Sequence, residues 1–121
     1  MAQIGSIFFI LWGVLHLYAA RLVYKLGARQ PAGMVRGRIY QSAWNLAFFA
    51  VAVVVVALVA GWNNSPLGYW LNAIMTAVTD VGFIVFVLIP GYLPLRPGLL
   101  GPALWIVARA FSTWAQFGPR L

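Results

Sequence analysis

The sequence predicts an all-α integral membrane protein, with four transmembrane helices in an up-down-up-down antiparallel bundle. Three observations indicate this class. Of the 121 residues, 64% are hydrophobic and only 7% are charged, whereas soluble domains carry about 25% charged residues. Four long apolar stretches are separated by clusters of glycine, proline and asparagine, which favour turns. The basic residues gather in the connections between particular stretches, a pattern typical of membrane topology.

The four stretches match the thickness of a bilayer, whose core of about 30 Å is crossed by about 20 helical residues. No Lys or Arg precedes Arg21, and the first apolar run is longer than that of a cleavable signal, so we expect a retained helix. The valine-rich second stretch is expected to be helical because hydrocarbon does not tolerate unpaired backbone groups. The predicted single domain, 1–121, contains the spans 4–24, 39–61, 68–89 and 102–117.

The charge distribution predicts the orientation. The net charge is +7, and most of it lies between the first two stretches. Arg96 lies between the third and fourth stretches, whereas the second connection has no charge. The positive-inside rule then places both termini on the non-cytoplasmic side, in what we expect to be a bacterial inner membrane. The positions of the basic residues are explained by membrane orientation, so nucleic acid is not an expected partner. Contact of these residues with anionic lipid headgroups is expected to result from the same orientation. The basic cluster comprises Arg21, Lys25, Arg29, Arg36 and Arg38.

Each stretch contains one strongly polar residue near the same depth. Counted from the cytoplasmic ends at about 1.5 Å per residue, these residues rise by about 9 to 13 Å. Helical spacing places each on a face with other polar or small residues, so we expect the four to converge inside the bundle. An Asp or Arg at a helix centre costs about 2.5 to 3.5 kcal/mol, so such residues are usually functional or tightly paired. The four residues are His16, Asn45, Asp80 and Arg109.

This polar layer predicts a site in which Asp80 is a base or nucleophile and His16 a general acid or base. Arg109 is expected to pair with Asp80, either as a structural clamp or as an oxyanion stabiliser. Simpler roles stay open, namely a packing role for His16 and hydroxyl bonds from threonine to the backbone one turn earlier. The expected substrate-binding residues are Asn45, Trp12, Trp44, Trp105 and Thr76.

Composition excludes several chemistries. A single acidic residue excludes a pair of catalytic carboxylates, and the absence of cysteine excludes thiolate chemistry. A single histidine excludes a multi-histidine metal site within one chain. No phosphate-binding glycine loop or zinc-protease motif is present. We therefore expect no cofactor and no metal; the alternative of haem or pigment on His16 would require two copies of the chain for bis-histidine ligation.

Three functions fit these features. The first is binding of a small lipophilic molecule, with cofactor-free acid–base chemistry such as isomerisation or epoxide opening. The second is a non-catalytic accessory subunit of a larger membrane complex. The third is a proton-linked small-molecule transporter acting as a parallel dimer, because four helices enclose little lumen. The expected partners are therefore the lipid bilayer, a small lipophilic ligand, and either a second copy or another membrane protein.

Overall fold

The computed structural model describes residues 1–118, and this part of the chain is all-helical with four long helices. Three of them, α1, α2 with its extension η1, and α3 with its extension η2, are long and apolar enough to cross a membrane. The prediction of four helices is confirmed, and each begins earlier than expected. The elements are α1 (Ala2–Ala28), α2 (Met34–Val56), the π-helical turn η1 (Ala57–Gly61), α3 (Pro66–Phe83), the π-helical turn η2 (Ile84–Leu88), α4 (Leu95–Gly98) and α5 (Leu100–Phe117).

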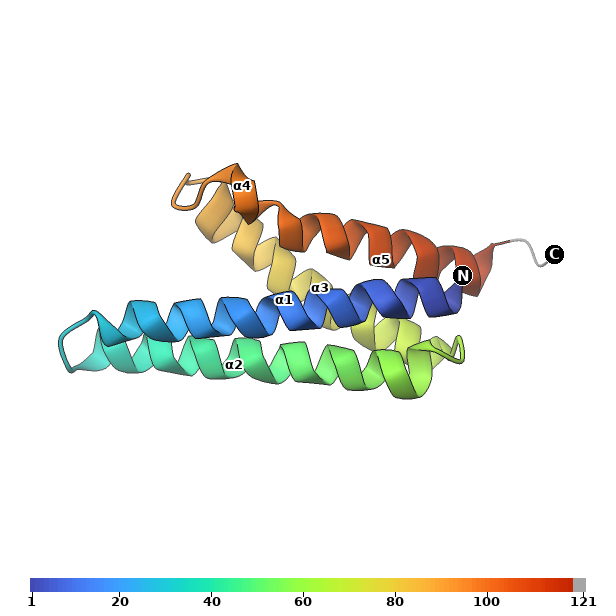
Figure 1. The fold of residues 1–121 in the computed structure, drawn as a ribbon, viewed down its shortest axis with the longest axis horizontal. Coiled ribbons are helices and arrows are strands. Elements are labelled where there is room, and N and C mark those ends of the chain that lie inside the picture. The colour runs from blue at the N-terminus through green and yellow to red at the C-terminus, as the bar shows by residue number, and fades with distance from the viewer. Residues whose placement is uncertain (119–121) are drawn as a thin grey trace.

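Helix α1 is the centre of the arrangement. It makes its largest interfaces with α2 on one side and α5 on the other, and α3 crosses obliquely behind it (Figure 1). Helices α1 and α5 run antiparallel, because Gly5 at the start of α1 faces Ser112 near the end of α5, whereas Gly101 at the start of α5 faces His16. Side chains from α1, α3 and α5 therefore meet near the middle of α1.

Small residues allow α1 and α2 to approach closely. A β-carbon on Gly13 would lie 2.8 Å from the carbonyl oxygen of Ala50, so only glycine fits at this crossing. The buried residues of α2 are likewise small, as is common between membrane helices, where backbone proximity replaces the hydrophobic effect as a source of packing energy. The buried face of α2 and η1 consists of Ala43, Ala50, Val53 and Ala57.

Large apolar side chains mostly face outward. The core is a small cluster built around Phe9 and Trp12 of α1. By contrast, Phe86 and Ile89 are each 73% exposed, and Phe48 is 63% exposed. Monomeric soluble proteins do not expose apolar surface on this scale. The exterior therefore matches the chemistry of lipid or of an apolar partner.

The connection between α3 and α5 has little regular structure. It contains only the short turn α4, in which Arg96 has non-helical backbone angles (φ -103°, ψ 114°), and α5 begins at Leu100 rather than at Pro102. Proline is tolerated at the third helical position because first-turn N–H groups have no helical acceptor. The chain turns back closely after α3, so Gly98 lies against Leu88 and Gly101 lies level with Asp80.

Candidate functional site

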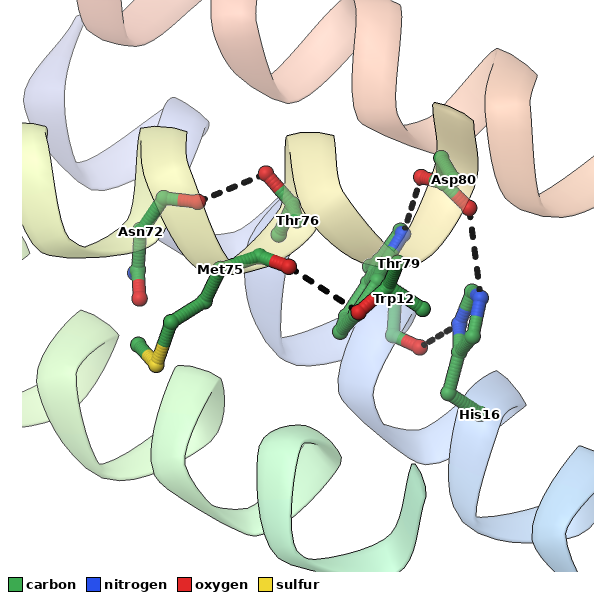
Figure 2. A network of polar contacts seen from close by, with 7 residues as sticks. All are labelled: Trp12, His16, Asn72, Met75, Thr76, Thr79 and Asp80. Atoms are coloured by element: carbon green, nitrogen blue, oxygen red, sulfur yellow. Dashed lines mark hydrogen bonds and ion pairs between the residues drawn. The ribbon is translucent and has the colours of Figure 1, made fainter. Parts of the chain in front are cut away.

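A polar network centred on Asp80 joins α3 to α1 (Figure 2). The Asp80 side chain is completely buried. The indole Nε1 of Trp12 donates a hydrogen bond to Asp80 Oδ2 at 2.8 Å, and His16 Nε2 lies 3.4 Å from Asp80 Oδ1. Trp12 and His16 are one helical turn apart on α1, and their rings stack with centroids 3.8 Å apart. One face of α1 thus supplies both partners of the carboxylate.

The hydrogen bonds of His16 determine how many protons the site holds. His16 Nδ1 lies 2.7 Å from the carbonyl oxygen of Trp12. A carbonyl can only accept, so Nδ1 must carry a proton. In a neutral imidazole the other nitrogen is then an acceptor, and it would face the carboxylate oxygen lone pair to lone pair. One further proton between Nε2 and Oδ1 removes this repulsion.

With that proton, the His16–Asp80 pair is either imidazolium with carboxylate or imidazole with carboxylic acid. Both forms have zero net charge, so both avoid leaving an uncompensated charge in a low-dielectric interior. Trp12 fixes the carboxyl group in either form because its N–H occupies Oδ2. The geometry therefore defines a buried pair that is suited to share one proton.

Gly101 of α5 covers this pair. A β-carbon at position 101 would lie 3.0 Å from His16 Cε1, 3.3 Å from His16 Nε2 and 3.7 Å from Asp80 Oδ1. The α5 backbone can approach this closely only because no side chain intervenes. A molecule that is to reach the carboxylate must therefore displace the start of α5.

The rest of the α3 face follows the simpler expectation for threonine. Thr76 is completely buried, and its hydroxyl donates to the backbone oxygen of Asn72 at 2.6 Å. Thr79 makes the same bond to Met75 at 2.9 Å. Asn72 was not among the expected site residues, although it shares the face of Asp80; its Nδ2 donates to the carbonyl oxygen of Val53 at 3.3 Å and ties α3 to α2.

The expected ion pair between Asp80 and Arg109 is wrong. Within residues 1–118 the ion-pair partner of Asp80 is His16, and the Arg109 guanidinium lies over the ring of Tyr69, 5.4 Å from its centroid. The reason is the depth at which α5 begins, because Gly101, near its start, already lies level with Asp80. Arg109 follows Gly101 by eight residues, so it lies about 12 Å further along the helix and is rotated by about 80°.

The expected inward face of α2 is also wrong. Asn45 is exposed and Trp44 is 75% exposed, so neither reaches the pair. Ala50 faces Gly13 of α1. Asn45 precedes Ala50 by five residues, which places it about 140° around the helix from that contact. Close packing of small residues, and not the polar side chain, determines how α2 is rotated.

The other two tryptophans among the expected substrate-binding residues, Trp12 and Trp105, lie closer to the network. Trp12 is completely buried and acts as a hydrogen-bond donor, a role that its apolar surface did not suggest. Trp105 is half-buried and packs against the core cluster that contains Trp12 and Phe9. Its indole nitrogen is buried without a hydrogen-bond partner in the described part of the chain. No group of three metal-ligating side chains occurs in residues 1–118.

The chain matches no protein-family model, curated protein or solved structure. The description of this protein therefore depends on its own fold and site. The chain is a helical bundle with three helices able to cross a membrane, and it has a Trp–His–Asp network in its interior.

Proposed function

We propose that this protein is a membrane-embedded acid–base centre that acts on a small lipophilic molecule. One observation carries the proposal: His16 Nε2 faces Asp80 Oδ1 at 3.4 Å while Nδ1 is already committed to the Trp12 carbonyl. A carboxyl group and an imidazole that share one proton can donate it and recover it. Ionisable groups within membrane segments are costly and mark functional sites by default.

The two side chains have complementary roles in this chemistry. In an isomerisation, Asp80 removes a proton from one carbon and His16 delivers a proton to another, so the pair ends with the proton count it started with. In epoxide opening, Asp80 takes a proton from the attacking water while His16 protonates the alkoxide oxygen that leaves carbon. Neither reaction consumes a cofactor. Trp12 is a positioning residue, because it holds Oδ2 and leaves Oδ1 to react.

Access to the pair depends on the contact between α1 and α5. Asp80 has no exposed surface, and Gly101 packs directly over the pair. The lipophilic molecule is therefore proposed to enter between the start of α5 and the middle of α1. The stretches 9–20 of α1 and 100–108 of α5 contain no Asp, Glu, Lys or Arg, which favours an apolar substrate.

The proposed setting is a bilayer crossed by all four long helices, with both termini on the non-cytoplasmic side of a bacterial inner membrane. The five cations of the basic cluster lie on α1 beyond Ala20, on the turn after it, or at the start of α2, and so at one end of the bundle. The exposed apolar exterior supports contact with lipid and with a second copy. Because the chain has no cysteine, single substitutions report the topology directly. Asn63→Cys should react with an impermeant maleimide in intact cells, and Ala32→Cys should not.

The test of the chemistry uses two simple lipophilic probes. Purified protein in liposomes is incubated in D₂O with cyclohex-3-enone or styrene oxide, and the conjugated enone, its deuterium content and the diol are measured. Asp80→Asn and His16→Gln should each lower the rate by at least about 100-fold, the usual contribution of an acid–base group. Asn45→Ala, on the outer face, is the matched control and should keep the full rate. Wild-type rates equal to those of empty liposomes with both probes would refute the proposal.

A second candidate is the non-catalytic subunit of a membrane complex. The complete burial of Asp80 favours it, because a clamp between α1 and α3 needs no access. This candidate predicts that the tagged chain, extracted from membranes in mild detergent, carries another protein in equal amounts. It also predicts that the complex survives Asp80→Asn. The catalytic proposal predicts a homo-oligomer or a single chain.

A further inference from the structure

A groove of about 570 Å³ runs along the outer side of α5. Its volume falls within the range of small-molecule sites, about 300 to 1,000 Å³. The lining combines one cation with aromatic and apolar side chains, and all of it lies between Trp105 and Gly118, along α5 and its C-terminal end. The lining residues used below are Trp105, Arg109, Thr113, Trp114 and Phe117.

The charge of Arg109 has no carboxylate partner in the described part of the chain. Asp80 is the sole acidic residue of the sequence, and it is already engaged by Trp12 and His16. The guanidinium contacts the face of Tyr69, a cation–π interaction worth about 0.5 to 2 kcal/mol. Its five N–H donors make no hydrogen bond or ion pair within residues 1–118. Among the described residues these donors therefore have no acceptor, which leaves them open to an acceptor from another molecule.

Tyr69 also holds the guanidinium in place from behind. It is buried, its hydroxyl lies 3.0 Å from Thr113 Oγ1, and its ring packs edge-on against Phe117 with centroids 5.5 Å apart. The contacts of Tyr69 with α5 thus fix the ring on which the Arg109 guanidinium lies, between α3 and α5. Trp105 lines the same groove four residues before Arg109, and its buried indole nitrogen has no partner among the described residues.

We infer that this groove binds an anionic amphiphile, with a carboxylate or phosphate head on Arg109 and a hydrocarbon chain along the indole and phenyl rings. A neutral lipid would leave the guanidinium unpaired, and a small water-soluble anion would leave the aromatic wall uncovered. The head group accepts from the guanidinium, which suits planar or tetrahedral oxyanions. The site lies on a different face of α5 from Gly101, so it goes beyond the proposed acid–base centre and does not depend on it.

The experiment measures quenching of tryptophan fluorescence by 9,10-dibromostearate in purified protein held in non-ionic detergent. We expect saturable quenching by the acid and only weak, non-saturating quenching by its methyl ester, which has the same chain without the charge. Arg109→Gln should raise the half-saturating concentration at least about tenfold, because a hydrogen bond to a charged group is lost. Arg96→Gln, at an exposed position of α4, loses the same charge and should bind as wild type.

Two further arms identify the source and the location of the ligand. If unbrominated oleate displaces the brominated acid and phosphatidate does not, the natural ligand is a free fatty acid. If phosphatidate displaces it and oleate does not, the ligand is a membrane lipid with a phosphate headgroup. Trp105→Phe should reduce the quenched fraction if the groove is the site. Equal quenching by acid and ester in the wild-type protein would overturn the inference without any variant, as would unchanged acid binding by a folded Arg109→Gln protein. Retained binding in Arg109→Lys would support it.

Discussion

Replacing Asp80 by asparagine or by alanine distinguishes the contribution of the hydrogen-bond geometry to stability from that of the carboxyl group's charge and proton. In Asp80→Asn, the amide oxygen can accept from Trp12 Nε1, and the amide N–H can donate to the bare Nε2 of His16, with no added proton. We therefore expect a change in unfolding free energy of within about 1 kcal/mol. Asp80→Ala leaves both the indole N–H and the imidazole nitrogen without partners. Loss of one charge-assisted bond and burial of two unpaired groups give an expected cost of about 3 to 5 kcal/mol.

The assay is reversible unfolding in mixed micelles by titration with sodium dodecyl sulfate, followed by tryptophan fluorescence and helical circular dichroism. Val78→Ala is the control on the same helix, because Val78 is 64% exposed, and it should change the unfolding free energy by less than about 0.5 kcal/mol. If Asp80→Asn cost as much as Asp80→Ala, the negative charge itself would hold the bundle and the neutral-network reasoning would fail. If Asp80→Ala cost nothing, the buried network would not exist in solution.

Two other predictions follow from packing. Gly101→Ala places a β-carbon 3.0 Å from His16 Cε1, and His16 cannot move away because Trp12 stacks on it, so we expect the unfolding free energy to fall by about 1 to 3 kcal/mol in the same titration. Gly82→Ala is the control, because its β-carbon meets nothing within 4 Å, and it should not lower the unfolding free energy. Equal behaviour of the two variants would contradict the close packing of Gly101 over the His16–Asp80 pair. Trp44→Ala and Asn45→Ala lie on the outer face of α2 and should leave unfolding of the isolated chain unchanged within about 0.5 kcal/mol, whereas a large loss for either would mean that α2 is rotated as the polar pattern suggested.

The faces of α1 and α3 could be predicted from the sequence. Both carry a polar residue whose neighbours one turn away are also small or polar, and His16, Thr76 and Asp80 are all buried as expected. On these helices the cost of an unpaired ionisable group determines which face turns inward. The apolar length of the first three helices likewise predicted their ability to span a membrane.

The α2 face and the Arg109 pairing could not be predicted because neither is determined by a polar side chain. The contact between Gly13 and Ala50 rotates α2, and small residues give no signal in a search for polar groups. The depth of Arg109 depends on how the connection returns to the bundle. Counting the fourth helix from the edge of the membrane placed Arg109 level with Asp80, whereas the helix begins deeper and Gly101 occupies that level. The donor role of Trp12 was hidden for a related reason, since indole contributes both apolar area and one N–H.

The presence of one histidine and one aspartate in the chain allows a direct measurement of the shared proton. Protein labelled with ¹⁵N-histidine and ¹³C-aspartate, diluted with unlabelled chain in bilayers, contains a single pair for solid-state NMR. We predict a protonated Nδ1 and a dipolar contact between Nε2 and the Asp80 carboxyl carbon over at most about 4.6 Å, the 3.4 Å contact plus one carbon–oxygen bond of about 1.2 Å. A bare Nδ1, or no detectable coupling between the two labels, would contradict the buried proton-sharing pair.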